Sequence, residues 1–112
     1  MKIFIALFLL TTMTSTFAQD SFSYLALGDS YSIGEQVSEE ESWPVLLTSF
    51  LNQQGYPVEK PEVIAVTGWR TDELQDSIAS LHYKKESFDL VSLLIGVNNQ
   101  YQKKPFKKFK SE

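Results

Sequence analysis

The sequence predicts an α/β protein with a three-layer α/β/α architecture, in which helices cover both faces of a parallel sheet. Three short apolar runs, each followed by a turn that contains glycine, alternate with two segments of helical periodicity. Apolar runs separated by helices are typical of parallel strands joined by right-handed crossovers. No fourth run of this kind follows, so the fold is expected to be truncated after the third strand.

The three apolar runs are the predicted strands, and the turns after them carry polar residues. In a parallel sheet these turns gather along one edge, where ligands bind in this class of fold. A serine, a glycine amide and an asparagine amide are therefore expected to converge. The strands are predicted at residues 24–27, 63–66 and 90–95, and the turns at residues 28–30, 67–69 and 96–99.

Two helices are predicted between the strands. The first has Ser42 as its N-cap and Pro44 in its first turn, and it ends at the Gly-Tyr-Pro sequence of residues 55–57. The second has Thr71 as its N-cap, followed by two acidic residues at the positive end of the helix dipole. Its apolar face is predicted to consist of Leu74, Ile78 and Leu81.

Residues 1–18 have the pattern of a secretory signal peptide, cleaved after Ala18. Lys2 precedes an unbroken apolar stretch at residues 3–10, which is too short to span a bilayer core of roughly 30 Å. We therefore expect a secreted or periplasmic protein without a stable membrane anchor. The mature chain is predicted to consist of one domain, residues 19–102, and a basic tail, residues 103–112.

Composition excludes several classes of function. The sequence has no cysteine, which excludes disulfides, thiol catalysis and cysteine-ligated metals. Residues 19–102 hold 13 acidic residues against four basic ones, so nucleic acid is not an expected partner. Residues 103–112 reverse this balance, with five lysines and one acid.

The three turns contain the groups that acyl transfer requires, namely a nucleophile and hydrogen-bond donors for the developing oxyanion. Ser30 is the candidate nucleophile. The Gly68 N–H is a candidate donor because no side chain blocks approach to it. The Asn98 amide is a second candidate, since it donates at every working pH.

Other chemistries lack their motifs. Ser32 stands where the G-x-S-x-G nucleophile elbow requires glycine, and neither a P-loop nor a G-x-G-x-x-G sequence occurs. The run of glutamates at residues 39–41 predicts a solvated charged loop rather than a metal site.

Taken together, the three turns resemble the first three sequence blocks of the SGNH hydrolases, also called the GDSL esterase/lipase family. The blocks are Gly28-Asp29-Ser30, Gly68 and Gly96-x-Asn98-Asn99, within residues 21 to about 101. The resemblance implies a flavodoxin-like fold. It also implies hydrolysis of small-molecule esters or thioesters, such as acylated sugars or lipids, without a cofactor. It assigns Ser30 as nucleophile, and the Ser30 N–H, Gly68 and Asn98 as the oxyanion hole. Asn99 stands where the family often has aspartate, and it is given no catalytic role.

The fourth block of the family, a D-x-x-H segment that supplies the general base and its orienting acid, is missing. The one histidine, His82, has Ala79 where the aspartate would be, and it is predicted to lie at the end of the second helix. We therefore expect the N-terminal part of an SGNH hydrolase domain with impaired catalysis. The alternatives left open are a non-catalytic module that binds acyl or sugar ligands and a small interaction protein.

Four aromatic or acidic positions receive structural roles at this point. Asp29 is predicted to bond the loop backbone, and Trp43 to pack in the first helix. Phe106 and Phe109 are spaced like one face of a helix, which predicts that they enter a core. Trp69 is left open between a substrate groove and the surface.

Overall fold

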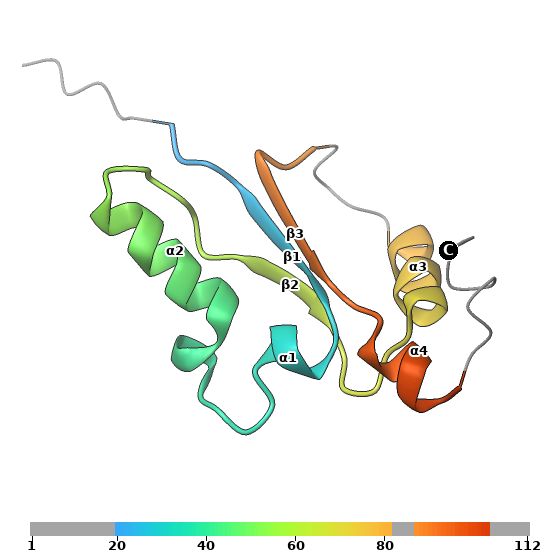
Figure 1. Cartoon of the computed structure of the whole chain (residues 1–112). Helices are drawn as coiled ribbons and strands as arrows, with labels where there is room; N and C mark the ends of the chain where they lie inside the picture. Colours follow the sequence, from blue (N-terminus) through green and yellow to red (C-terminus); the bar gives the residue numbers. More distant parts are fainter. Residues whose placement is uncertain (1–19, 82–86, 104–112) are drawn as a thin grey trace, which may run out of the picture.

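The computed structural model of the chain describes residues 20–81 and 87–103 (Figure 1). The predicted signal peptide, His82, Phe106 and Phe109 lie outside the described residues. None of the described helices is long and apolar enough to cross a membrane.

A parallel sheet with strand order β2-β1-β3 forms the centre of the molecule. This confirms the predicted α/β fold and places the first strand between the other two. Gly28, the last residue of β1, pairs with Ala65 of β2 and with Leu94 of β3, so the three strands end level with one another. The strands are β1 (Tyr24–Gly28), β2 (Glu62–Ala65) and β3 (Leu90–Leu94).

Helices α2 (Trp43–Gln53) and α3 (Thr71–Ser80) lie on opposite sides of the sheet (Figure 1). The α2 side holds the hydrophobic core, built around Tyr24, Ala26 and Val58. Strand residues alternate between the two faces, so Leu25 and Leu27 of β1 point toward the α3 side. Burial of both faces of β1 agrees with its continuous apolar sequence.

The start of α2 differs from the prediction in one respect. Ser42 is the N-cap residue by position, but its hydroxyl donates to the Glu39 carbonyl oxygen at 2.7 Å and makes no capping bond. The reason is the preceding segment: residues 39–41 form a 3-10 helix, η1 (Glu39–Glu41), and not a loop, and Ser42 closes its last turn. Pro44 occupies the first turn of α2 as predicted, and Gly55, with φ of 90°, follows its end.

The start of α3 also differs from the prediction. Thr71 is the first helical residue, and Arg70 holds the N-cap position. The Glu73 carboxylate accepts from the Arg70 N–H at 3.0 Å, which satisfies one of the free donors at this helix end. At the other end, Leu81 lies one residue beyond the helix and is exposed, so the buried face of α3 depends on Leu74.

Two turns that were predicted as loops contain short helices, α1 (Ser30–Ile33) and α4 (Val97–Tyr101). Each begins at the carboxyl end of a strand of the sheet, α1 after β1 and α4 after β3. The strand ends therefore lead into helical backbone, which fixes the residues that follow more firmly than an irregular loop would.

Candidate active site

Ser30 is the first residue of α1, directly beyond the carboxyl end of the central strand. The turn before it is tight because Gly28 packs against two neighbours. A Cβ atom at this position would overlap the Ser32 side chain and come within 2.6 Å of the Leu94 carbonyl oxygen. Glycine therefore allows α1 to fold back closely over the end of β1, and this close approach sets the position of Ser30.

Asp29 caps α1 and holds the turn together. Its Oδ1 atom accepts a hydrogen bond from the Tyr31 N–H at 3.0 Å, and its side chain is only 1% exposed. Its carbonyl oxygen accepts from the N–H groups of Ser32 and Ile33, each at 3.0 Å. The predicted role of Asp29 in bonding the loop backbone is confirmed.

Ser30 is half-buried, and its carbonyl oxygen accepts from the N–H groups of Gly34 and Glu35 at 3.2 and 3.1 Å. In the described part of the chain its hydroxyl and its N–H have no hydrogen-bond partner. Both groups therefore remain available to a ligand at the edge of the sheet. The assignment of Ser30 as nucleophile stays a prediction.

Gly68 follows β2 in a turn closed by a hydrogen bond from the Trp69 N–H to the Val66 carbonyl oxygen, at 3.2 Å. Its φ of 84° lies in the left-handed region, where residues with a Cβ atom are strained. A Cβ atom here would find no other atom within 4 Å, so open space adjoins this residue. Among the described residues the Gly68 N–H has no hydrogen-bond partner, as an oxyanion donor requires.

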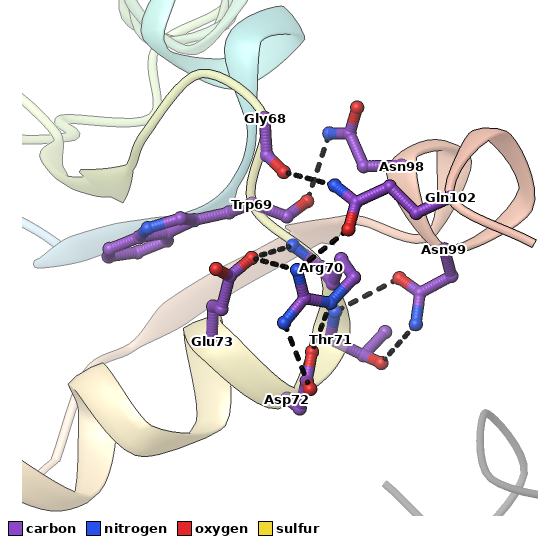
Figure 2. Close-up of polar contacts among 9 residues, drawn as sticks. All are labelled: Gly68, Trp69, Arg70, Thr71, Asp72, Glu73, Asn98, Asn99 and Gln102. Carbon is purple, nitrogen blue, oxygen red and sulfur yellow. Dashed lines mark hydrogen bonds and ion pairs between the residues drawn. The ribbon is translucent and has the colours of Figure 1, made fainter. Parts of the chain in front are cut away.

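Asn98 lies in α4, beyond the end of β3. Its Nδ2 atom donates to the Trp69 carbonyl oxygen at 2.9 Å (Figure 2). This bond ties the turn after β3 to the turn after β2 and uses one of the two amide hydrogens. The second hydrogen remains for another acceptor, and the bond to Trp69 fixes the plane in which it lies.

A polar network around the start of α3 connects the same two turns (Figure 2). The Asn99 side chain accepts from the Thr71 N–H at 3.0 Å and donates to the Thr71 hydroxyl at 2.8 Å. Gln102 donates to the Gly68 carbonyl oxygen at 3.4 Å and accepts from Arg70 at 2.7 Å. The sequence analysis missed this network. The sequence does contain four amide side chains within residues 98–102, which could have indicated a polar network here. It does not reveal their hydrogen-bond partners, which lie 28 to 34 positions away.

The cation in this network is neutralised within it. The Arg70 guanidinium forms ion pairs with Asp72 at 2.9 Å and with Glu73 at 3.3 Å. The donors that border the candidate site are thus neutral amides and not cations. Within residues 20–81 and 87–103, no three acidic or histidine side chains gather as metal ligands would.

A hollow of about 290 Å³ adjoins the turn that carries Ser30. It is mostly apolar, and the lining residues with polar side-chain groups are Asp29 and Tyr31. An apolar hollow beside a polar turn is the usual form of a small-molecule site. Its lining consists of Asp29, Tyr31, Leu94, Ile95 and Val97.

The three predicted site residues thus follow three adjacent strands that end level with one another. Neighbouring strands lie about 4.8 Å apart, so the turns at their carboxyl ends border one another. Gly68 and Asn98 are joined through Trp69, while Ser30 is held on the middle strand by its own turn. Trp69 itself is half-buried and supplies its carbonyl oxygen to the arrangement.

Comparison with solved structures finds proteins with the same fold. The structure resembles AlinE4, an SGNH-hydrolase family esterase, with a TM-score of 0.63 and 23% sequence identity over 83% of this chain. It also resembles TesA, with a TM-score of 0.70 and 20% identity over 80% of this chain. The chain has the SGNH-hydrolase fold. No protein-family model matches the sequence, and no curated protein gives a significant match.

The chain spans about half the length of these structures, 49% of AlinE4 and 48% of TesA. At these identities the likeness establishes the fold, and the roles of individual residues are a matter for the proposal that follows.

Proposed function

We propose that this chain carries the nucleophile and the oxyanion hole of a serine hydrolase that cleaves carboxylic or thio esters. The main support is that Ser30, Gly68 and Asn98 follow three level, adjacent strands of one sheet. The fold is that of SGNH hydrolases, and one of the similar structures is an esterase. We propose a small-molecule ester, such as an acylated sugar or lipid, as the substrate class.

In this mechanism the Ser30 Oγ attacks the ester carbonyl carbon, and the carbonyl π electrons move to the oxygen. The resulting oxyanion accepts hydrogen bonds from the Ser30 N–H, the Gly68 N–H and the second Asn98 amide hydrogen. Loss of one such donor costs about 10²–10³ in rate in serine hydrolases. The alcohol or thiol then leaves, and water releases the acyl group from Ser30.

Removal of the proton from the Ser30 hydroxyl is the step that we expect to limit the rate. The Ser30 hydroxyl must lose its proton during attack, and the usual base is a histidine held by an acid. The sequence has one histidine, His82, without an aspartate three residues before it. We therefore propose that this chain, acting alone, acylates and deacylates slowly.

The test is p-nitrophenyl acetate hydrolysis by the mature chain, with mass spectrometry to locate an acetyl group. We expect slow p-nitrophenol release and an acetyl adduct on Ser30. Ser30→Ala removes the adduct, whereas the matched variant Ser49→Ala, an exposed serine of α2, leaves it unchanged.

Three results would change the proposal. An adduct that persists in Ser30→Ala would reject Ser30 as nucleophile. Rapid turnover that Ser30→Ala abolishes would keep the nucleophile and reject the slow-catalysis claim. Saturable ester binding without any adduct, equal in both variants, would favour a non-catalytic binding module.

We also propose that the chain is exported, with residues 1–18 removed as a signal peptide. Expression in a bacterial host and N-terminal sequencing of the exported product tests this. Gln19 as the first residue agrees with the proposal, and a product that retains Met1 contradicts it.

A further inference from the structure

A groove of about 570 Å³ runs between α3 and the sheet, on the side away from α2. Most of its lining is apolar, and it lies apart from the hollow beside Ser30, sharing only Ile95 with it. The lining residues come from β1, α3 and the end of β3: Leu27, Thr71, Leu74, Gln75, Ile78, Ala79, Leu93 and Ile95.

Helix α3 covers only part of this face. Leu74 is buried, but Leu93 of β3 is 65% exposed and Val91 is 53% exposed. The register pairs Leu27 with Leu93 and Leu25 with Val91, so these side chains form one apolar surface next to α3. The groove and the two exposed side chains of β3 together make a surface that another apolar segment would cover.

We propose that residues 104–112 of this same chain bind in the groove, with Phe106 and Phe109 as the two apolar anchors. These residues lie outside the described part of the chain, which reaches Lys103. Gln102, just before that point, accepts a hydrogen bond from Arg70, the N-cap residue of α3. The segment therefore starts beside the Thr71 end of the groove.

Length fits this occupant. Along α3 the groove extends from Thr71 to Ala79, about 12 Å at 1.5 Å per residue. Nine residues in a helix would extend about 13.5 Å. Phe106 lies three positions after Lys103, and three extended residue steps are enough to reach about 10 Å into the groove.

Side-chain spacing also fits. Phe106 and Phe109 are three positions apart, so they would share one face of a helix, and that face would meet the groove. Lys107 and Lys108 lie between them in sequence and would point elsewhere. The segment thus has an apolar face for the groove and a basic face for its rim and solvent.

Charge favours the same contact. Helix α3 carries three acidic residues and no basic one. Asp72 and Asp76 are one helical turn apart, and each directly follows a groove residue, Thr71 and Gln75 respectively, so they form a row along the groove margin. Asp72 and Glu73 share one cation, Arg70, so the row keeps a net negative charge. Residues 103–112, with five lysines and one acid, complement this row, and salt should weaken that part of the contact.

The absence of cysteine makes a direct test possible. Two double variants of the mature chain are compared: Ala79→Cys with Lys110→Cys, which joins the groove to the segment, and Ser49→Cys with Lys110→Cys, which joins exposed α2 to it. We expect the groove pair to form an intramolecular disulfide on the order of tenfold faster than the control pair. Mass spectrometry and non-reducing gels distinguish this monomer from a disulfide-linked dimer. Equal rates for the two pairs, or mainly dimeric product from the groove pair, would overturn the proposal.

A second comparison tests the anchors. Adding Phe106→Ser and Phe109→Ser to the groove pair should remove its rate advantage and raise the binding of an apolar dye to the protein. The matched change Lys107→Ser with Lys108→Ser should leave the groove pair forming its disulfide faster than the control pair at high salt, since the phenylalanines remain. An advantage that survives loss of both phenylalanines would reject them as anchors. None of these measurements uses Ser30, so their outcome and that of the esterase test are independent.

Discussion

At the scale of single residues, Gly28 determines how closely α1 approaches the sheet. In Gly28→Ala the new Cβ atom would overlap Ser32 and approach the Leu94 carbonyl oxygen, so α1 and Ser30 must move. We expect a loss of about 1–3 kcal/mol in unfolding free energy, measured with urea, and slower acetylation of Ser30. Gly55→Ala is the control: its φ of 90° is strained but its surroundings are open, so stability should fall and acetylation should not. Unchanged acetylation in Gly28→Ala would contradict this account.

Tyr24 gives a prediction for high pH. Burial raises the pKa of its hydroxyl above the usual 10.0, and the hydrogen bond with Ser92 offsets part of that effect. A raised folded-state pKa means that the folded protein holds the proton more tightly, so this contribution is fully present below pH 10 and is lost as pH rises through the folded-state pKa. Between about pH 9 and pH 12 we expect urea midpoints to fall more for the wild type than for Tyr24→Phe. Parallel curves would show that Tyr24 does not contribute.

At the scale of elements, the start of α3 depends on a residue from a different turn. Asn99→Ala would leave the Thr71 N–H without its acceptor, and we expect a loss of about 1–2 kcal/mol by urea unfolding. Asn99→Asp should be tolerated, because a carboxylate can accept from both the Thr71 N–H and its hydroxyl and lies near the positive end of the helix. The neighbouring Gln100→Ala, at an exposed position, serves as the control. A loss as large for Asn99→Asp as for Asn99→Ala would reject the capping role.

The elements also show what the sequence can and cannot predict. Strand positions and helix existence follow from local apolar patterns, and all three strands lie within one residue of their predicted ranges. The cap of α3 was predicted one residue too late, and Ser42 holds the N-cap position of α2 without making the capping bond. Both differences arise from contacts outside the helix: Ser42 bonds back to Glu39, and Thr71 is bonded by Asn99. The spacing of Ser30, Gly68 and Asn98 after three strands was readable from the sequence. The bond from Asn98 to Trp69 that orients the amide was not, because it joins positions 29 residues apart.

At the scale of the whole molecule, the two faces of the sheet are covered to different extents. The α2 side closes around Tyr24, Ala26 and Val58, whereas the α3 side leaves Val91 and Leu93 exposed. The same face borders the outer edge of β3, which within the described residues pairs only with β1. The molecule therefore combines a sheet edge that carries the candidate site with an apolar flank. The proposed binding of residues 104–112 would cover part of that flank but leave the strand edge open.

An open strand edge next to apolar side chains favours pairing between molecules, so we expect the mature chain to self-associate as its concentration rises. Val91→Lys places a charge on β3 beside that edge and should reduce light scattering at a given concentration. Leu46→Lys is a matched control, because Leu46 lies on α2 and, like Val91, is 53% exposed. A general effect of added charge would lower scattering equally in both variants, whereas association through β3 lowers it in Val91→Lys alone. A wild-type chain that stays monomeric and melts cooperatively and reversibly would show that the edge of β3 is already protected.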